Sequence, residues 1–333
     1  MSRLRRRALI LLYHRVAEVP TDPQLLCVTP DNFARHMEIV RTTCNPISLR
    51  QLTSGLQNKR VPRRSVLVTF DDGYADNLYN AKPILERYDI PAVVFVAAGY
   101  VGSHNEYWWD ELEKLLLRPG SLPDELELKI NGNDTRRRLD EPARIYSEAD
   151  YREHADWSLN KRSVPTGRHG LYLDLYKTMR PLGPERQTEM LESLRAWSGC
   201  MTGVREAYQP MTAPEVQRLR DGNLVAVGAH TISHPILSGL TVANQQNEIL
   251  GSRDLLREIT GEPVTSFAYP YGGDGDYTAE TVDVVRQAGF ECAFSTASGL
   301  TRNDSEHFRL PRIWVRNWSA DTFERRLHGW WLL

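Results

Sequence analysis

The sequence has few cysteines, little net charge and no long apolar run. Its four cysteines are scattered without a CxxC pair, so neither a zinc ribbon nor a disulfide framework is indicated. Free thiols of this kind fit a reducing compartment. The net charge of −2 over 333 residues gives no sign of a protein that binds nucleic acid through bulk electrostatics.

No apolar stretch approaches the roughly 20 residues that a membrane-spanning helix needs. Residues 5–16 place arginines before an apolar stretch, as a signal peptide does. That stretch lasts only from Ala8 to Tyr13, and no small-residue cleavage site follows it. These absences predict a cytoplasmic protein. The C-terminal sequence RRLHGWWLL is basic and aromatic, which fits a peripheral membrane contact and equally a helix end packed on the core.

Short apolar segments alternate with amphipathic ones along most of the chain. Residues 8–13, 65–70 and 91–101 are continuous and apolar, as strands buried on both faces are, and helical spacing separates the last two. The alternation resumes near residue 211 and reaches six or more strand–helix units. It predicts an α/β fold with a parallel sheet, open or closed.

Between residues 104 and 210 this alternation is interrupted. The segment contains helical patterns and, from 129 to 170, a polar arginine-rich stretch with weak periodicity. We interpret it as a mainly helical insertion within a single domain of residues 1–333. Trp108 and Trp109 occupy helical positions in it and are expected in its core.

Two aspartates directly follow a buried strand in LVTFDDGYADN, residues 67–77. Acidic residues at the carboxyl end of a parallel strand stand where α/β barrels place their active sites. Adjacent residues of an extended chain point in different directions, so one of Asp71 and Asp72 is expected to bind a metal and the other to address the substrate. The alternative is a helix cap and a turn, because Asp-Gly is a common turn pair.

Two histidines, His230 and His234, follow another apolar strand in GAHTISHP, residues 228–235. Residues four apart on a helical turn share one face, as two imidazole ligands of one metal require. A pair of surface histidines is the alternative. Together with the aspartates they form a two-histidine, one-carboxylate set, which leaves coordination positions open for water and substrate.

TFDDGY together with HTISHP resembles the polysaccharide deacetylases, the NodB-homology group of carbohydrate esterases. The resemblance covers residues 8–103 and 211–315. It implies an irregular (β/α) barrel of fewer than eight strands, interrupted by the helical insertion. It also implies a metal-dependent enzyme that removes N-acetyl groups from amino sugars.

The resemblance assigns roles to these four residues. In the family pattern the first aspartate is the general base and the second a metal ligand, which implies Asp71 as base and Asp72, His230 and His234 as ligands. The implied metal is zinc, with cobalt, nickel or manganese as other candidates. The backbone N–H of Tyr74 is expected to hold the tetrahedral oxyanion together with the metal.

The chain departs from the family pattern in its third motif. SFAYPYGG, residues 266–273, has Ala268 where the family carries an arginine that orients the base. Tyr269, Pro270 and Tyr271 are still expected to form a wall of the substrate groove. We favour Arg312, in RLPRIWV, as the replacement; a pairing of this arginine with a surface carboxylate is the alternative.

The histidine that the family supplies as general acid from a C-terminal Leu-x-His strand is also missing, because that strand reads LPRIWV. A circularly permuted branch of the family, the poly-N-acetylglucosamine deacetylase-like enzymes, carries this histidine in a Tyr-His motif on its first strand. LLYHRV and FAYPYG resemble that branch. His14 is therefore predicted to be the proton donor, with a strand-end histidine bonded to backbone as the alternative. Four other histidines lack a ligand-spaced partner and are expected at the surface: His36, His104, His154 and His169.

These observations predict a metal-dependent hydrolase that removes the N-acetyl group from an amino sugar in a glycan, a lipid-linked sugar or a glycosylated precursor. Two alternatives stay open at this point. One is a hydrolase of a non-sugar amide or formamide, and the other is a non-catalytic carbohydrate-binding member of the same fold.

Overall fold

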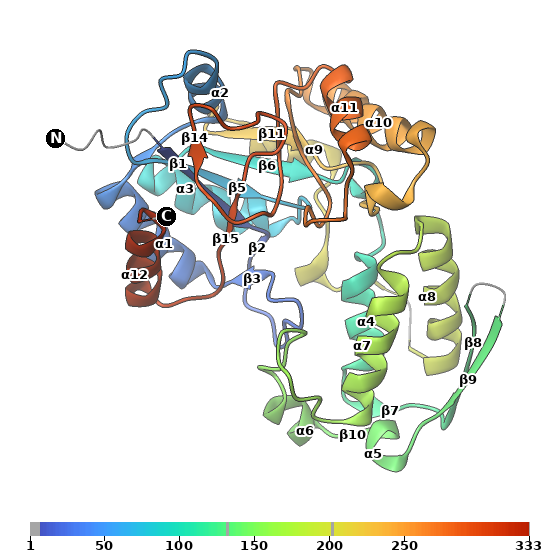
Figure 1. Cartoon of the computed structure of the whole chain (residues 1–333). Helices are drawn as coiled ribbons and strands as arrows, with labels where there is room; N and C mark the ends of the chain where they lie inside the picture. Colours follow the sequence, from blue (N-terminus) through green and yellow to red (C-terminus); the bar gives the residue numbers. More distant parts are fainter. Residues whose placement is uncertain (1–6, 131–132, 201–202, 333) are drawn as a thin grey trace. The chain divides into compact units, whose positions relative to one another are not determined.

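The computed structural model describes residues 7–130, 133–200 and 203–332, which divide into two compact units (Figure 1). The first unit comprises Met1–Glu18, Leu26–Ser103 and Pro210–Leu333, and the second comprises Val19–Leu25 and His104–Gln209. Residues 1–6, which include part of the segment considered as a signal peptide, lie outside the described residues. Within the described ranges, no helix is both long enough and apolar enough to cross a membrane.

A curled sheet forms the centre of the first unit. Its strand order is β13-β12-β11-β6-β5-β1-β14, with every pairing parallel except that of β14. The predicted α/β fold with an irregular barrel and a parallel sheet is therefore confirmed. The strands are β1 (Arg7–Tyr13), β5 (Ser65–Phe70), β6 (Ala92–Val96), β11 (Val225–Ala229), β12 (Ser266–Ala268), β13 (Cys292–Phe294), β14 (Thr301–Arg302) and β15 (Ile313–Trp314), with β4 (Asn45–Pro46) beside β5 and the separate pair β2 (Arg15–Val16) and β3 (Cys27–Val28).

The segment 310–315 connects the two sides of the curled sheet. At one end the backbone N–H of Leu310 donates to the carbonyl of Ala293 in β13, at 2.9 Å. At the other end the N–H of Val315 donates to the carbonyl of Leu12 in β1, also at 2.9 Å, and β15 pairs with β1 in parallel. This segment therefore lies between the first and last parallel strands and completes the barrel wall.

Both faces of the sheet are buried, as its continuous apolar strands predict. Leu9 and Leu11 of β1 belong to the cluster that includes residues of the surrounding helices. Ala8 and Ile10 belong to a second cluster, formed by side chains of β5, β6, β12 and β13 and sealed by α2 (Leu49–Gln57). The second cluster is the barrel interior.

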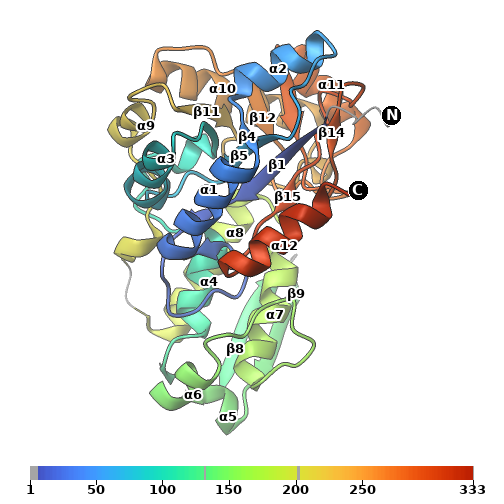
Figure 2. The ribbon, with the colours of Figure 1, turned by 90° about the vertical axis from the view of Figure 1, so that its left-hand side faces the viewer.

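Helices cover the outside of the sheet. They are α1 (Pro30–Thr43), α3 (Lys82–Tyr88), α9 (Ala213–Leu219), α10 (Val242–Thr260), α11 (Ala279–Gln287) and α12 (Ala320–Trp330). In both ribbon views α12 lies alongside α1 (Figures 1 and 2), and the Phe323 ring of α12 stacks on the His36 ring of α1. Phe323 and Leu327 are buried, so the structure supports packing of this helix on the core.

Between β5 and β6 a π-helical turn, Asn77–Ala81, leads directly into α3, and Pro83 is the second residue of α3. One sequence expectation about this unit needs correction. His36 is fully buried instead of exposed. Its Nε2 donates to the Trp318 carbonyl at 2.8 Å and its Nδ1 lies 3.3 Å from the Tyr13 hydroxyl, so hydrogen bonds replace its hydration.

The second unit contains helices and two small antiparallel sheets. Its elements are α4 (Trp108–Leu116), α5 (Glu141–Arg144), α6 (Glu148–Glu153), α7 (Gly167–Met179), α8 (Pro184–Ser198), the hairpin β8 (Glu125–Ile130) and β9 (Asn133–Arg138), and the pair β7 (Gly120–Ser121) and β10 (Ile145–Tyr146). Trp108 and Trp109 are buried, as predicted, whereas His169 is buried against expectation. The segment Val19–Leu25 joins this unit through Thr21, whose hydroxyl donates to Glu113 at 2.7 Å.

Candidate active site

Three of the predicted site residues follow directly after parallel strands of the first unit. His14 follows β1, Asp71 follows β5 and His230 follows β11. The carboxyl ends of parallel strands meet at one edge of a sheet, so these residues are brought together although they are far apart in sequence. Alternation along β5 also gives Asp71 the same direction as Leu67, which faces the barrel interior.

Asp72 does not diverge from Asp71 as an extended chain would require. Its φ of 75° and the φ of 84° at Gly73 turn the chain back immediately after β5. A Cβ on Gly73 would lie 3.0 Å from Cγ1 of Val96, so the turn also needs a residue without a side chain. As a result both carboxylates approach His230 Nε2: Asp72 Oδ1 at 3.6 Å and Asp71 Oδ2 at 3.9 Å.

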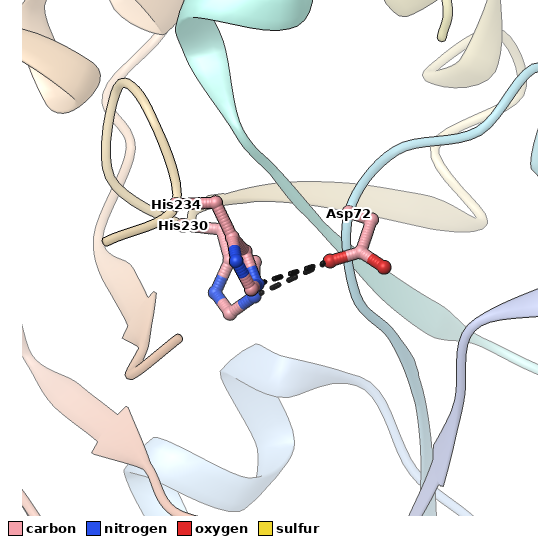
Figure 3. Close-up of side chains that lie close together, drawn as sticks. All are labelled: Asp72, His230 and His234. Atoms are coloured by element: carbon pink, nitrogen blue, oxygen red, sulfur yellow. Dashed lines mark ion pairs between the residues drawn. The ribbon is translucent and has the colours of Figure 1, made fainter. Parts of the chain in front are cut away.

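Asp72, His230 and His234 converge on one point (Figure 3). One ligand atom from each of these buried residues lies within 4.8 Å of the other two, and His234 Nε2 is 3.4 Å from Asp72 Oδ1. Ligand atoms about 2.0–2.2 Å from a tetrahedral zinc ion lie about 3.4 Å from one another. The separations of this donor set therefore fit a single divalent ion.

The imidazole of His230 is held in the tautomer that a metal ligand needs. Its Nδ1 lies 2.7 Å from the carbonyl oxygen of Ala268 and must donate to it, which leaves the lone pair on Nε2. Burial lowers the pKa of His230 to about 3, so the ring is neutral near pH 7. Ala268 stands where the family motif has arginine, and here its backbone orients a proposed ligand.

The loop that carries the two histidines is not the helical turn that their spacing predicts. Thr231 and His234 have φ values of 64° and 58°, and no helix covers residues 230–234. The carboxylate of Glu248 in α10 accepts the backbone N–H groups of Ile232 and Ser233 at 2.8 and 2.9 Å, and the Ser233 hydroxyl at 2.6 Å. A carboxylate from a distant helix thus holds a loop whose backbone is strained.

Sequence reasoning missed Glu248. It lies on α10, fourteen residues after His234, among other polar positions. Nothing in the spacing distinguishes it from the exposed glutamate Glu258 on the same helix. Only the path of the loop around the end of β11 brings Glu248 to these N–H groups.

Arg312 forms a bidentate ion pair with Asp71. Its Nη1 and Nη2 each donate to one carboxylate oxygen at 2.7 Å, and Nε donates to the Ser295 carbonyl at 2.9 Å. Both side chains are buried, so the alternative of a pairing with a surface carboxylate is wrong. A bidentate pair fixes the plane of the carboxylate as well as its position.

His14 is buried, with 9% of its surface exposed. Its ring packs 4.9 Å from the ring of Trp314 in β15, and no hydrogen-bond partner of its Nδ1 is found among the described residues. Burial lowers the pKa of His14 to about 3. The negative charge of Asp71 raises this pKa in part, and the positive charge of Arg312 lowers it further. The ring is therefore neutral at rest and electrostatically coupled to the Asp71–Arg312 pair.

The four residues predicted to contact substrate occupy different environments. Tyr271 lies beside the candidate metal ligands, with its ring 4.8 Å from that of His234. Tyr269 is fully buried, its hydroxyl donates to the Phe308 carbonyl at 2.9 Å and its ring stacks on a neighbouring tyrosine, which indicates a packing role for this side chain. Pro270 is buried as well, and Tyr74 is buried under a guanidinium.

Carboxylates and imidazoles gathered at the carboxyl ends of the strands occupy the position of the active site in α/β-barrel enzymes. A sequence model of the family described as "Polysaccharide deacetylase" matches residues 58–122 and 198–293, which include both the aspartate and the histidine motifs. This match assigns a polysaccharide deacetylase domain to the chain, as the resemblance predicted.

Relatives with assigned names agree with this match. The chain is 25% identical over 310 residues, 92% of its length and 70% of the relative's, to YxkH of Bacillus subtilis (strain 168), itself provisionally named a polysaccharide deacetylase. It is 35% identical over 72 residues to a poly-beta-1,6-N-acetyl-D-glucosamine N-deacetylase of Staphylococcus aureus (strain MSSA476). That match covers 22% of this chain and 25% of the relative, so it concerns a part of each protein.

Solved structures share the fold. The Streptococcus pyogenes deacetylase PplD, solved in complex with acetate, aligns with a TM-score of 0.59 at 17% identity, over 97% of this chain and 99% of that one. IcaB from Ammonifex degensii also aligns with a TM-score of 0.59 at 17% identity, over 98% of this chain and 97% of that one. At this identity the likeness concerns the fold alone.

Proposed function

We propose that this protein is a metal-dependent hydrolase that removes the N-acetyl group from an amino sugar. One observation carries the proposal: a buried Asp72–His230–His234 donor set lies next to the buried Asp71–Arg312 pair. A donor set alone would fit a structural ion. The second carboxylate, that of Asp71, lies beside this donor set, with Oδ2 3.9 Å from Nε2 of His230. A carboxylate in this place fits a reaction in which a proton must be removed.

Asp72, His230 and His234 would hold one divalent ion, with zinc as the first candidate and cobalt, nickel or manganese as the others. When bound, such an ion supplies Lewis acidity toward water and toward a carbonyl oxygen. The nitrogen ligands and the single carboxylate suit zinc and its neighbours better than magnesium or calcium, which prefer oxygen.

The remaining residues would handle protons and orientation. Asp71 accepts the proton of the attacking water, and the two hydrogen bonds from Arg312 hold its carboxylate in a fixed orientation. The backbone N–H of Tyr74 would donate to the tetrahedral oxyanion. His14, neutral at rest, first takes up a proton from solvent and then delivers it to the leaving amine nitrogen. Negative charge that develops nearby during the reaction favours this uptake and opposes the effect of burial.

The substrate class comes from the relatives. The Staphylococcus aureus relative is named for poly-beta-1,6-N-acetyl-D-glucosamine, and a Bacillus subtilis relative, 34% identical over 97 residues, is named a peptidoglycan-N-acetylmuramic acid deacetylase. We propose an N-acetylated sugar of this kind, in a glycan or in a precursor of one. The cytoplasmic location that the sequence predicts is part of the proposal and would favour a precursor.

Release of acetate by the zinc-loaded protein tests this function. β-1,6-linked N-acetylglucosamine oligomers, peptidoglycan fragments and a nucleotide-linked N-acetylglucosamine should be compared as substrates. We expect acetate from at least one of them, and loss of turnover with retention of zinc in Asp71→Asn. Release of formate from a formamide without release of acetate would favour the non-sugar amide hydrolase. Sugar binding without turnover and without stoichiometric metal would favour the binding module.

A further inference from the structure

The chain segment that carries His14 is attached to the segment that carries the aspartates. The backbone N–H of Asp71 donates to the Tyr13 carbonyl at 3.1 Å. Six residues further along, the side-chain amide of Asn77 donates to the His14 carbonyl at 2.8 Å. Asn77 is buried, with 1% of its surface exposed. Both ends of the sequence DDGYADN thus contact residues 13–14.

Asp76 anchors the next two residues. Its Oδ1 accepts the backbone N–H of Val16 at 2.9 Å, and its Oδ2 accepts Nε of Arg15 at 3.0 Å. The Arg15 side chain is 1% exposed, and its guanidinium lies 4.5 Å from the ring centroid of Tyr74. A buried ion pair with a stacked guanidinium is a rigid connection, because each group has lost the water that could replace its partner.

His14 itself lies in the interruption between β1 and β2. Its Nδ1 has no hydrogen-bond partner among the described residues, and its side chain rests against the Trp314 ring. No hydrogen bond at Nδ1 therefore orients the ring, as one does for His230. The direction of the His14 side chain follows from how its backbone is held.

We propose that Asp76 and Asn77 are positioning residues for His14. They fix the backbone of residues 14–16 and so set the place of the proton donor relative to Asp71, which belongs to the same short segment. This inference rests on the proposed function, in which His14 protonates the leaving amine. It assigns a task to two residues that neither bind the metal nor touch the base.

The dependence of the rate on the leaving group tests the proposal. Asn77→Ala removes the hydrogen bond to the His14 carbonyl and leaves the proposed metal ligands unchanged. On an N-acetylglucosamine oligomer we expect kcat to fall by about tenfold to 100-fold with KM unchanged, because small misplacements of a catalytic group have effects of this size. On 4-methylumbelliferyl acetate, whose phenolate leaves without a proton, we expect no loss. Zinc affinity should equal that of the unaltered protein.

A double-variant cycle separates positioning from general damage. In the His14→Ala background, Asn77→Ala should cause no further loss of amide hydrolysis, because the group through which it acts is gone. Asp76→Asn, which keeps an acceptor for Val16 and loses the charge opposite Arg15, is the second variant if Asn77→Ala fails to fold. Asp283→Ala, which removes an exposed carboxylate–arginine pair of the same unit, is the matched control.

Two results would overturn the inference. Equal losses on the amide and the aryl ester would show that Asn77 acts on the site in general. An equal loss from Asn77→Ala with and without His14 would show that it does not act through His14. Failure of the proposed function is a separate outcome: full amide hydrolysis by His14→Ala would remove His14 from the proton-donor role whatever Asn77→Ala does.

Discussion

Arg312 and Asp71, separated by 241 positions in the chain, form a buried ion pair with two hydrogen bonds of 2.7 Å. The pair depends on the segment 310–315 entering the barrel wall between β13 and β1. The family's usual position for this arginine is occupied by Ala268. In this chain the arginine that pairs with Asp71 therefore comes from the segment 310–315.

The bidentate geometry predicts that lysine cannot replace Arg312. Arg312→Lys keeps the charge but cannot form both parallel hydrogen bonds or retain the one to Ser295. We expect kcat for acetate release to fall at least tenfold, while zinc affinity measured by competition with a chelator stays the same. Arg309→Lys, a change at an exposed position three residues before Arg312, is the control. Undiminished kcat in Arg312→Lys would contradict orientation of the base by this arginine.

Glu248 is expected to support metal binding from outside the ligand set. Glu248→Ala leaves the N–H groups of Ile232 and Ser233 without their acceptor and releases a loop that contains two residues with positive φ. Loss of such supporting hydrogen bonds lowers metal affinity by about 10–100-fold. Calorimetric titration of the metal-free protein with zinc measures this change in affinity directly.

Two further variants test whether the loss of zinc affinity comes from the hydrogen bonds of Glu248. Glu248→Gln retains an oxygen for the backbone N–H groups and should lose less affinity than Glu248→Ala. Glu258→Ala, an exposed change on α10, should leave affinity unchanged. The prediction is wrong if Glu248→Ala binds zinc as tightly as the unaltered protein.

Gly228 of β11 is expected to be irreplaceable because the barrel interior is full. A Cβ at this position would lie 2.4 Å from two ring carbons of Phe95 and 2.8 Å from Oγ of Ser266. Gly228→Ala should lower the free energy of unfolding by about 1–3 kcal/mol, the range for overpacked cores. Urea denaturation measures the change, and Phe95→Leu in the Gly228→Ala background should recover part of it. Equal midpoints for Gly228→Ala and the unaltered protein would contradict this packing.

His36 is expected to make stability depend on pH. Burial lowers its pKa from 6.5 to about 4, so the unfolded chain binds the proton before the folded one does. The contribution of the neutral His36 to the free energy of unfolding is complete above pH 6.5 and is lost as the pH falls toward 4. The loss is about 1.4 kcal/mol per pH unit and about 3 kcal/mol in total. The free energy of unfolding of the metal-free protein, measured by denaturation between pH 7 and 4, should fall more steeply with decreasing pH than that of His36→Gln. Parallel pH dependences of the two proteins would contradict this prediction.

The sequence alone determined the elements and the chemical candidates. Continuous apolar runs at 8–13 and 65–70 are recognisable as strands because both faces of a parallel sheet are buried. Each polar residue that directly follows such a run, from His14 to Asp71 and His230, is placed at the carboxyl edge by the topology of parallel sheets alone. These local patterns were sufficient to predict the parallel sheet and the edge that these residues share, whereas the barrel was implied by the family resemblance.

Only the tertiary structure decided how the side chains meet. The positive φ of Asp72 and the loop of His234 reverse the directions that an extended strand or a helical turn would give. The partner of the histidine loop, Glu248, comes from a helix whose sequence spacing carries no signal. Arg312 was a candidate from the sequence, and only the structure distinguished its pairing with Asp71 from a pairing with a surface carboxylate. Periodicity records which face of an element is buried, whereas such contacts depend on where the chain passes after each element ends, and that path is set by packing across the whole barrel.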